Sequence, residues 1–236
     1  VASISSPNPR KILAEMACRF YDHPSKKLKL VGITGTNGKT SIATWLYNMV
    51  RGMGYPAGLL STILIGIEGK EVPATHTTPD PITLNTYLAA MVEAGCEFVF
   101  MEVSSHALDQ DRVHGIHFSG AVFTNLTQDH LDYHVTFAAY IKAKKILFDD
   151  LHKDAFALIN TDDRNGSVMV QNCAARVKSY SAHGLADYKV KVMEQHPEGM
   201  NMLLDNQELW VPVVGQYNAY NLLACYGVAC ELGLDA

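Results

Sequence analysis

One stretch constrains the fold of this chain more than any other, the sequence VGITGTNGKT at residues 31–40. The apolar run at residues 28–33 predicts a buried strand, and apolar side chains three or four positions apart over 42–53 predict a helix. Gly35 and Gly38 permit a tight turn between the two. Backbone N–H groups of such a turn converge with the helix N-terminus on one point, which stabilises a phosphate.

The last residues of this motif add the chemistry of a nucleotide site. Lys39 would reach the terminal phosphates, and the Thr40 hydroxyl would hold Mg²⁺. The common phosphate-binding pattern is G-x-x-x-x-G-K-[ST], but Ile33 occupies the place of its first glycine here. The alternative is a glycine-rich turn with a chance Lys-Thr pair, which leaves the flanking strand and helix unexplained. We therefore interpret residues 31–40 as a phosphate cradle.

Composition limits the partners that this chain can have. Its 236 residues suffice for one large domain, and 48% hydrophobic residues predict a soluble, core-forming globule. A formal net charge of −5 gives no general attraction to nucleic acid or to anionic membrane. No apolar run approaches the ~20 residues that a membrane helix needs. We expect neither nucleic acid nor membrane as a partner.

The cysteines indicate a reducing compartment, because they are odd in number and form no C-x-x-C pair. Small buried hydrophobes explain them better than metal or redox chemistry. No signal peptide opens the chain, so we expect a cytoplasmic location. The chain begins at Val1 and stops at Ala236, just after a predicted helix, and we interpret it as an excised domain or a partial chain. The five cysteines of the chain are Cys18, Cys96, Cys173, Cys225 and Cys230.

Strand and helix patterns alternate along the chain, which predicts an α/β fold with a mostly parallel sheet flanked by helices. Further strands are predicted at 58–65, 97–103, 120–124, 155–159 and 177–180. Further helices are predicted at 9–20, 82–94, 137–148, 168–175 and 217–232. We expect the first of these helices to bury Ile12, Leu13, Met16 and Phe20. Short strands at 188–193, 200–204 and 208–214 predict a small antiparallel subsheet near the C-terminal end.

Glu102 lies within the apolar strand predicted at 97–103. An ionised carboxylate is costly there unless it is paired or bound to a metal. A glutamate facing solvent at an edge is the alternative. We favour a Mg²⁺ ligand, because the carboxyl ends of parallel strands gather ligands at one edge, where Glu102 and Thr40 should meet. The neighbouring residues 104–106 (SSH) lack a G-x-S-x-G elbow, so we reject a hydrolase nucleophile.

The segment NLTQDHLDYH at 125–134 follows the next predicted strand and suits a metal or phosphate site, with a capped loop as the alternative. His130 and His134 are four residues apart, but two histidines alone do not make a zinc site. On the following helix, the pattern predicts a charged face, although Lys144 could turn inward. An ordinary lysine, with a pKa near 10.4, would be an unfavourable cation beside Mg²⁺.

Taken together and in this order, these motifs resemble those of the Mur ligases of peptidoglycan synthesis, and more narrowly their tripeptide-forming branch. The resemblance covers residues 28–233 and includes the closing segment GQYNAYN at 215–221. It implies that ATP phosphorylates the terminal carboxylate of UDP-MurNAc-L-Ala-D-Glu. The amino group of a diamino acid, meso-diaminopimelate or L-lysine, then attacks the acyl phosphate. It also implies a monomer.

The resemblance implies roles for individual residues. Lys39, Glu102, His130 and Lys144 would be catalytic, and Mg²⁺ would be held by Thr40, Glu102, His130 and Lys144. Lys144 would act as a carbamate, which converts the awkward cation into a carboxylate-like ligand. ATP would be bound by Gly35, Thr36, Asn37, Gly38, Lys39, Thr40, Ser41, Asn218 and Asn221. UDP-MurNAc-dipeptide would be bound by His76, Thr77, Thr78, Ser104, Gln110 and Arg112.

The resemblance also implies a division of the chain. Residues 1–27 would be the remnant of an N-terminal UDP-binding domain with its linker, and residues 28–236 the central ATP-binding domain. The C-terminal, amino-acid-binding domain would be absent, so this chain alone is expected to bind nucleotide at best. His76 departs from the family, where asparagine is frequent, which leaves that substrate contact in question.

Three other functions compete with this interpretation. A folylpolyglutamate synthase-like ligase would share the cradle and the Mg²⁺ site, but the sequence HTTP at 76–79 argues against it. A non-ligase P-loop NTPase would predict a guanine motif such as N-K-x-D, which the sequence lacks. A non-catalytic scaffold would not need Lys39, Glu102, His130 and Lys144.

Overall fold

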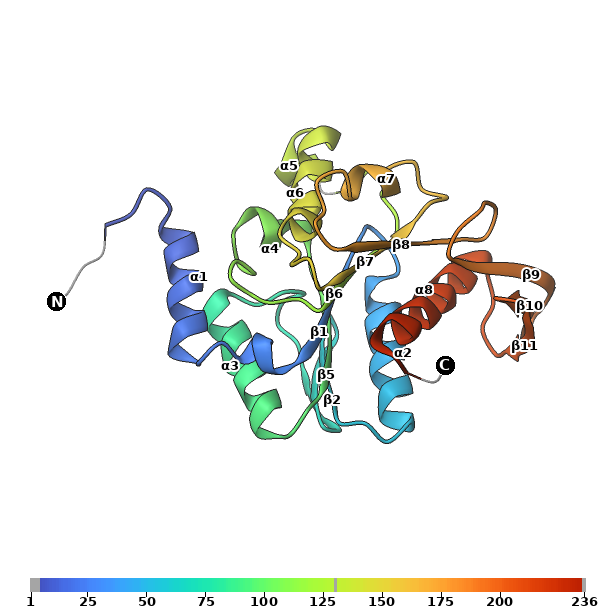
Figure 1. The fold of residues 1–236 in the computed structure, drawn as a ribbon, viewed down its shortest axis with the longest axis horizontal. Helices are drawn as coiled ribbons and strands as arrows, with labels where there is room; N and C mark the ends of the chain where they lie inside the picture. The colour runs from blue at the N-terminus through green and yellow to red at the C-terminus, as the bar shows by residue number, and fades with distance from the viewer. Residues whose placement is uncertain (1–4, 130, 235–236) are drawn as a thin grey trace.

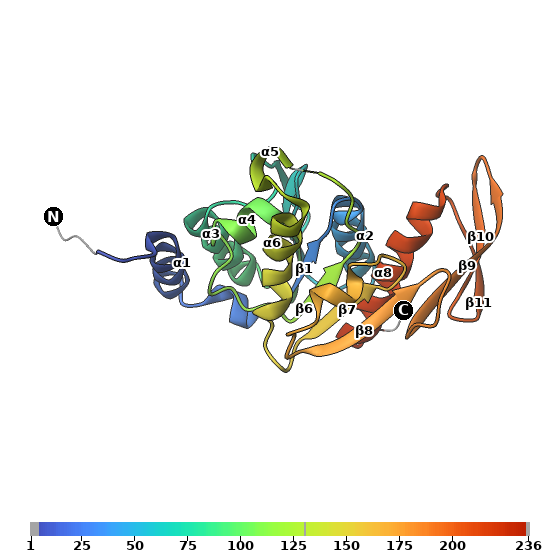
Figure 2. The same ribbon diagram turned by 90° about the horizontal axis from the view of Figure 1, so that it is seen from above.

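The computed structural model describes residues 5–129 and 131–234, which contain an eleven-stranded sheet flanked by helices (Figures 1 and 2). The strand order is β11-β10-β9-β8-β7-β6-β1-β5-β2-β3-β4. The strands from β2 to β9 in this order pair in parallel, whereas β3, β4, β10 and β11 pair antiparallel at the two ends. The predicted α/β class and the antiparallel subsheet at the C-terminal end are confirmed.

The strands of this sheet are short. They are β1 Lys29–Thr34, β2 Ala57–Leu60, β3 Leu64–Ile67, β4 Lys70–Pro73, β5 Phe98–Glu102, β6 Gly120–Phe123, β7 Phe156–Asn160, β8 Arg176–Ser181, β9 Tyr188–His196, β10 Gly199–Leu204 and β11 Gln207–Val211. The helices are α1 Pro9–Phe20, α2 Lys39–Gly52, α3 Pro81–Glu93, α4 Ser105–Asp109, α5 Leu131–His134, α6 Phe137–Asp149, α7 Gly166–Met169 and α8 Gln216–Leu232, with a 3₁₀ turn, η1, at Pro24–Lys27.

Alternating side chains of the central strands bury two cores, one on each face of the sheet. On β1, Leu30 packs in the core with α3, α4 and α6, whereas Val31 packs in the core with α2 and α8. Figure 1 shows α2 and α8 on one side of the sheet and α3, α4 and α6 on the other. Because both faces are covered, the middle positions of the central strands are apolar, and polar residues such as Glu102 and Asn160 lie at strand ends. This arrangement leaves the ends of the strands free to carry polar side chains.

The strand predicted at 58–65 is wrong, because this segment folds as a hairpin. β2 and β3 run antiparallel and are joined by a turn at residues 61–63. The hydroxyl of Ser61 donates to the carbonyl of Leu64 at 2.9 Å and accepts the N–H groups of Ile63 and Leu64. This side-chain bonding favours a turn where the apolar run suggested a continuous strand. The bounds of the helix predicted at 168–175 are also wrong, because the observed helix, α7, is shorter and lies at Gly166–Met169.

The face of α1 that packs on the domain is the reverse of the predicted one. Leu13, Met16 and Phe20 are 43%, 48% and 82% exposed, and Ile12 is half-buried. The buried residues are Ala14, Ala17 and Cys18. Helix α1 contacts α3, and small side chains allow the two helices to approach closely. Hydrophobic spacing located the helix, but steric fit selected the face.

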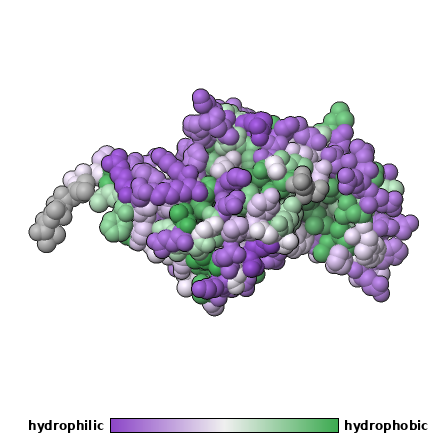
Figure 3. All heavy atoms as spheres, turned by 60° about the horizontal axis from the view of Figure 1, so that its bottom comes forward, coloured by the Kyte–Doolittle hydropathy of each residue, from purple (hydrophilic) through white to green (hydrophobic). Residues whose placement is uncertain are grey.

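Polar residues dominate the face of the molecule in Figure 3, and apolar atoms are confined to patches between them. Within residues 5–129 and 131–234, no helix has the length and apolar character needed to cross a bilayer.

Candidate functional site

The turn between β1 and α2 forms the predicted cradle, and two of its positions require glycine. Gly35 has φ +146° and Gly38 has φ +90°, in the region that side chains disfavour. A Cβ at Gly35 would collide with the Thr124 hydroxyl, and one at Gly38 would collide with the side chain of Asn221. Helix α2 begins at Lys39 directly after this turn, so its free N–H groups face the same space.

Two lysines lie at the cradle and share one acceptor. The Lys39 amine donates to the carbonyl oxygens of Gly35 and Thr36 at 2.9 and 2.8 Å. The Lys144 amine, from α6, donates to the same Gly35 oxygen at 2.8 Å. Lys144 is only 2% exposed. The inward turn considered for Lys144 is therefore confirmed, and the charged-face interpretation is wrong for this residue.

Burial lowers the pKa of both lysines. For Lys144 the pKa falls well below 10.5, mainly through desolvation and then through repulsion from Lys39, against attraction from Asp129. For Lys39, desolvation lowers the pKa, and attraction from Glu102 and Asp129 partly offsets it. The ring of Tyr140 lies 4.6 Å from the Lys144 nitrogen. A buried amine with a low pKa is neutral more often, which makes it nucleophilic.

Glu102 is the last residue of β5 and is fully buried. One carboxylate oxygen accepts the N–H of Thr62 at 2.7 Å, and the other lies 3.1 Å from the Thr62 hydroxyl. Within the described residues, Glu102 forms no ion pair. Its partner in the parallel register is Ile33 of β1, one residue before Thr34, at which β1 ends. A buried carboxylate at this edge suits a divalent cation that takes oxygen ligands.

Thr40, the second residue of α2, is half-buried, and its hydroxyl forms no hydrogen bond with the residues that the structure describes. It is therefore available to a ligand, in keeping with the predicted metal role. The donor set fits Mg²⁺ as far as Thr40 and Glu102 are concerned. His130 lies outside the described residues, so the structure does not address its predicted part.

The loop after β6 holds the cradle from the other side. The Asn125 side chain accepts the N–H of Asn37 at 3.0 Å, and the Thr36 hydroxyl accepts the N–H of Thr127 at 3.0 Å. Asp163, which sequence reasoning missed, accepts the N–H of Leu126 at 2.7 Å. Residues 125–127 thus support the turn between β1 and α2.

The residues predicted to bind the UDP-MurNAc-dipeptide form one network, except His76. The Thr78 hydroxyl donates to the carbonyl of Glu102 at 2.9 Å and accepts the N–H of Ser104 at 3.1 Å. Arg112 donates to the carbonyl of Thr78 at 2.9 Å and to the side-chain oxygen of Gln110 at 2.7 Å.

Within the described residues, the Arg112 guanidinium has no acidic partner, so it is free to pair with an anionic ligand. His76 is exposed, and its ring lies 3.1 Å from the neighbouring Thr75 hydroxyl, outside this network.

A cavity of about 670 Å³ opens beside the cradle, of a size that suits a nucleotide. Asn221 of α8 lines it, and the Asn221 amide donates to the Asn218 side chain at 3.3 Å. Asn160 and Tyr180, near the carboxyl ends of β7 and β8, also line it, and sequence reasoning missed them. Their positions at the ends of predicted strands were the signal in the sequence that could have identified them as ligand-binding candidates. The remaining lining residues are Asn37, Gly38, Ser41, Thr124, Asn125, Thr127, Gln216, Tyr217 and Tyr220.

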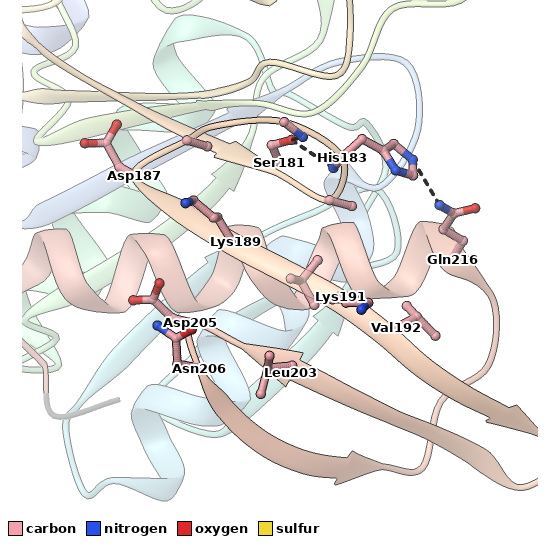
Figure 4. A pocket seen from close by; sticks show the side chains of 14 residues that line it. Ser181, His183, Asp187, Lys189, Lys191, Val192, Leu203, Asp205, Asn206 and Gln216 are labelled. Atoms are coloured by element: carbon pink, nitrogen blue, oxygen red, sulfur yellow. Dashed lines mark hydrogen bonds between the residues drawn. The ribbon is translucent and has the colours of Figure 1, made fainter.

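A second cavity, of about 630 Å³, continues from the first along β9 (Figure 4). Gln216 lines both cavities, and its side chain lies 3.2 Å from the His183 ring. Lys189 and Lys191 project from β9 along this second cavity. Both lysines are exposed, whereas Ser181, which also lines this groove, is buried.

Comparison with known proteins decides the family. A profile described as the Mur ligase middle domain matches residues 33–229. The chain belongs to the Mur ligase family. It is 56% identical over 223 residues to the UDP-N-acetylmuramoyl-L-alanyl-D-glutamate--2,6-diaminopimelate ligase of Parabacteroides distasonis, covering 94% of this chain and 46% of that protein. It is 53% identical over 233 residues to the ligase of the same name from Phocaeicola vulgatus, covering 99% and 48%.

Solved Mur ligase structures share this fold. A 2,6-diaminopimelate ligase of the same name superposes with a TM-score of 0.86 at 29% identity, over 98% of this chain and 49% of that one. A folylpolyglutamate synthase of Mycobacterium tuberculosis complexed with ADP superposes with a TM-score of 0.78 over 97% and 59%, but at 18% identity. That second likeness concerns the fold alone. The chain spans about half the length of the curated relatives it matches.

Proposed function

We propose that the protein carrying this chain is an ATP-dependent Mur ligase that joins 2,6-diaminopimelate to UDP-MurNAc-L-Ala-D-Glu, and that this chain is its ATP-binding part. Relatives that are 52% to 56% identical carry the name of that ligase. One structural observation carries the proposal further. Glu102 is bonded through its backbone carbonyl to Thr78 and lies close enough to Lys39 for its charge to offset part of the lowering of the Lys39 pKa by burial.

The cradle would bind the phosphates of ATP. Its N–H groups and the start of α2 would hold the β- and γ-phosphates, and Lys39 would leave the carbonyls of Gly35 and Thr36 to contact them. The adenine would lie in the cavity lined by Asn221, with Asn218 supporting that side chain. Ser41 also lines this cavity and would complete the phosphate site.

The acceptor network would hold the second anion. Arg112 is fixed by Thr78 and Gln110, so its guanidinium is already oriented towards a carboxylate or phosphate. Thr77 and Ser104 would supply further hydrogen bonds to the dipeptide. Holding the acceptor carboxylate next to the γ-phosphate removes the entropic cost of bringing two anions together.

Mg²⁺, held by Thr40 and Glu102 with His130 and carbamylated Lys144 as further ligands, would supply the positive charge that offsets the phosphate oxygens. For Lys144 the proposal is supported by its buried, low-pKa amine, which can attack CO₂ and release a proton to form the carbamate. The carbamate would place an anion on the side chain whose nitrogen lies 2.8 Å from the Gly35 oxygen, and attraction to Lys39 would replace the repulsion between the two lysines.

The reaction then follows from these positions. The acceptor carboxylate attacks the γ-phosphorus and ADP leaves, which gives an acyl phosphate. The amino group of diaminopimelate attacks the acyl carbon, loses a proton and expels phosphate. We further propose residues 28–236 as the central ATP-binding domain and 1–27 as the remnant of a UDP-binding domain, in a cytoplasmic monomer.

Phosphate release from ATP by the full-length protein tests this proposal. The assay would contain UDP-MurNAc-L-Ala-D-Glu and, separately, meso-diaminopimelate, L-lysine or no amine. We expect release that needs both the nucleotide dipeptide and meso-diaminopimelate. Release with L-lysine but not with meso-diaminopimelate would change the proposed amino acid to L-lysine. Release only with a folate and glutamate would assign the protein to the folylpolyglutamate synthase activity and overturn the acceptor site.

A further inference from the structure

Tyr133 has none of the roles assigned above, yet its hydroxyl contacts two side chains at the end of α4. The Gln110 amide nitrogen donates to the Tyr133 oxygen at 3.1 Å, and the Tyr133 hydroxyl donates to the Asp109 carboxylate at 2.8 Å. Asp109 is the last residue of α4, Gln110 follows it as the C-cap, and Tyr133 belongs to α5. This hydroxyl therefore ties α5 to the C-terminal end of α4.

The other end of the Gln110 amide holds Arg112. The amide oxygen accepts Nε–H and Nη2–H of Arg112 at 3.1 and 2.7 Å. If the amide were turned over, its N–H groups would face a guanidinium, which can only donate. Gln110 can therefore hold Arg112 in one amide orientation only, with its oxygen towards Arg112 and its nitrogen towards Tyr133.

The two ends of this chain of hydrogen bonds have fixed polarity. The Arg112 guanidinium can only donate, and an ionised Asp109 carboxylate can only accept, whereas the two side chains between them can do both. One arrangement of protons satisfies every bond: Arg112 donates to Gln110, Gln110 to Tyr133, and Tyr133 to Asp109. Each bond in such a chain polarises the next. Tyr133 thus supports the amide orientation that Arg112 requires.

The Tyr133 ring is held independently of its hydroxyl. Its centroid lies 4.2 Å from that of the His106 ring in α4 and 4.9 Å from that of the His134 ring in α5. Tyr133 is 37% exposed, so its ring lies at the surface against these two rings. A phenylalanine at this position would keep the ring contacts and lose only the two hydrogen bonds.

These bonds leave donors for a ligand. A guanidinium has five N–H groups. In the described part of the chain, two of those of Arg112 are taken by Gln110 and one by the Thr78 carbonyl. The other two remain for an anion, and the Gln110 amide keeps one N–H besides the one given to Tyr133. The orientation of all these donors depends on bonds that end at Tyr133 and Asp109.

We propose that Tyr133 is a positioning residue for the anionic acceptor substrate, and that it acts through the Gln110 amide on Arg112. This inference rests on the proposed function. Without the Tyr133 hydroxyl, the amide can turn over and Arg112 loses the oxygen that holds it. Binding of the acceptor must then also order these two side chains, and that loss of conformational entropy lowers the affinity.

Calorimetric titration of the full-length protein with UDP-MurNAc-L-Ala-D-Glu tests this without turnover, in the presence of Mg²⁺ and a non-hydrolysable ATP analogue. Tyr133→Phe should bind the acceptor about twofold to tenfold more weakly, as expected for one hydrogen bond, and should bind the ATP analogue as the wild type does. In the ligation assay the KM for acceptor should rise while kcat stays near the wild-type value, because the hydroxyl supports binding before and during the reaction alike.

A double-mutant cycle shows whether Tyr133 acts through Gln110. Gln110→Ala should weaken acceptor binding, and adding Tyr133→Phe to it should weaken binding no further. Asp109→Asn and Asp109→Ala remove the same charge, but asparagine keeps an oxygen that can accept the Tyr133 proton. Asp109→Asn should therefore bind the acceptor more tightly than Asp109→Ala.

Tyr188→Phe is the matched control. The Tyr188 hydroxyl also donates to a carboxylate, that of Glu231, at 2.7 Å, but from β9 to α8. We expect this variant to bind the acceptor as the wild type does. Melting temperatures of all variants would show whether each one folds.

The outcomes distinguish this inference from the function on which it rests. If Tyr133→Phe binds the acceptor as tightly as the wild type, Tyr133 has no positioning role, although the ligase stands. If Tyr133→Phe weakens binding equally in the Gln110→Ala background, Tyr133 acts by another route and the inference is wrong. If the wild type does not bind UDP-MurNAc-L-Ala-D-Glu, the proposed acceptor site itself fails, and the inference fails with it.

Discussion

Lys39 and Lys144 donate to the same backbone oxygen, the carbonyl of Gly35, from two different helices. The two amines are therefore neighbours inside the phosphate cradle, and each disfavours the charge of the other. Repulsion from Lys39 is the second cause, after burial, that lowers the pKa of Lys144. Carbamylation of Lys144 or binding of a phosphate would relieve this repulsion, since either adds negative charge.

The low pKa of Lys144 predicts a pH-dependent stability. In the folded chain the pKa lies well below the ordinary value of 10.5. Between the two values the unfolded chain binds a proton that the folded chain lacks, so the free energy of unfolding rises with pH. One proton gives at most about 1.4 kcal/mol per pH unit, and the rise ends above pH 10.5.

Chemical denaturation in CO₂-free buffer from pH 7 upward would measure this. The wild type should gain stability with pH relative to Lys144→Gln, which lacks the amine. Lys142→Gln, at an exposed position of the same helix, is the control and should follow the wild type. Parallel curves for the wild type and Lys144→Gln would contradict a depressed pKa at this residue.

Carbamylation of Lys144 predicts a new carbonyl carbon in the protein. Incubation with ¹³C-labelled bicarbonate should give one ¹³C NMR carbamate resonance that is absent from Lys144→Gln, because a buried neutral amine is the group that reacts with CO₂. Mg²⁺ with ADP should intensify that resonance, since the metal stabilises the carbamate as a ligand. Unmodified lysine under those conditions would remove Lys144 from the proposed ligand set.

Glu102→Gln should separate metal binding from folding. Neutralising a fully buried carboxylate removes a desolvation cost, so the metal-free variant should be at least as stable as the wild type. The extra stabilisation that Mg²⁺ adds to the ADP-bound wild type should disappear in the variant. Thermal melts with ADP, with and without Mg²⁺, measure both effects. An equal response of both proteins to Mg²⁺ would exclude Glu102 as a ligand.

Gly38→Ala should abolish nucleotide binding, because its Cβ would collide with Asn221 in the adenine-side cavity. Gly54→Ala is a matched control, since Gly54 has a similar φ of +88° but no atom within 4 Å of an added Cβ. Both variants carry the same backbone strain, of order 1 kcal/mol. Titration with ADP should therefore fail for the first variant only. Equal affinity of the two variants for ADP would show that the Asn221 side chain moves aside for the added Cβ.

Tyr180→Phe should cost about 1 kcal/mol of stability. Its buried hydroxyl donates to the carbonyl of Phe123 at 3.1 Å, and removing it leaves that carbonyl without this donor. Burial also raises the pKa of Tyr180 far above its usual range. Urea denaturation would measure the loss, with Tyr217→Phe as the control because Tyr217 is 68% exposed. Equal midpoints for both variants would contradict a role for this bond.

Much of the fold followed from local patterns. The helices at 9–20, 82–94 and 137–148 were found within a residue or so, because apolar spacing and capping act within one segment. The β2–β3 hairpin was missed because the side-chain hydrogen bonds of Ser61, which close the turn, are not visible in a run that is mostly apolar. The buried face of α1 was missed because close contact with α3 favours alanine and cysteine over larger side chains.

The sequence by itself determined the cradle, the sheet class and most of the candidate residues, because each is encoded in contiguous motifs. Tertiary structure alone decided which of those residues meet. In the folded chain Lys144 donates to the Gly35 carbonyl oxygen, to which Lys39 also donates. Thr62 donates to Glu102, which is forty positions away along the chain. Such contacts depend on which strands become neighbours in the sheet. The order of strands in space differs from their order in sequence, and no local pattern encodes it.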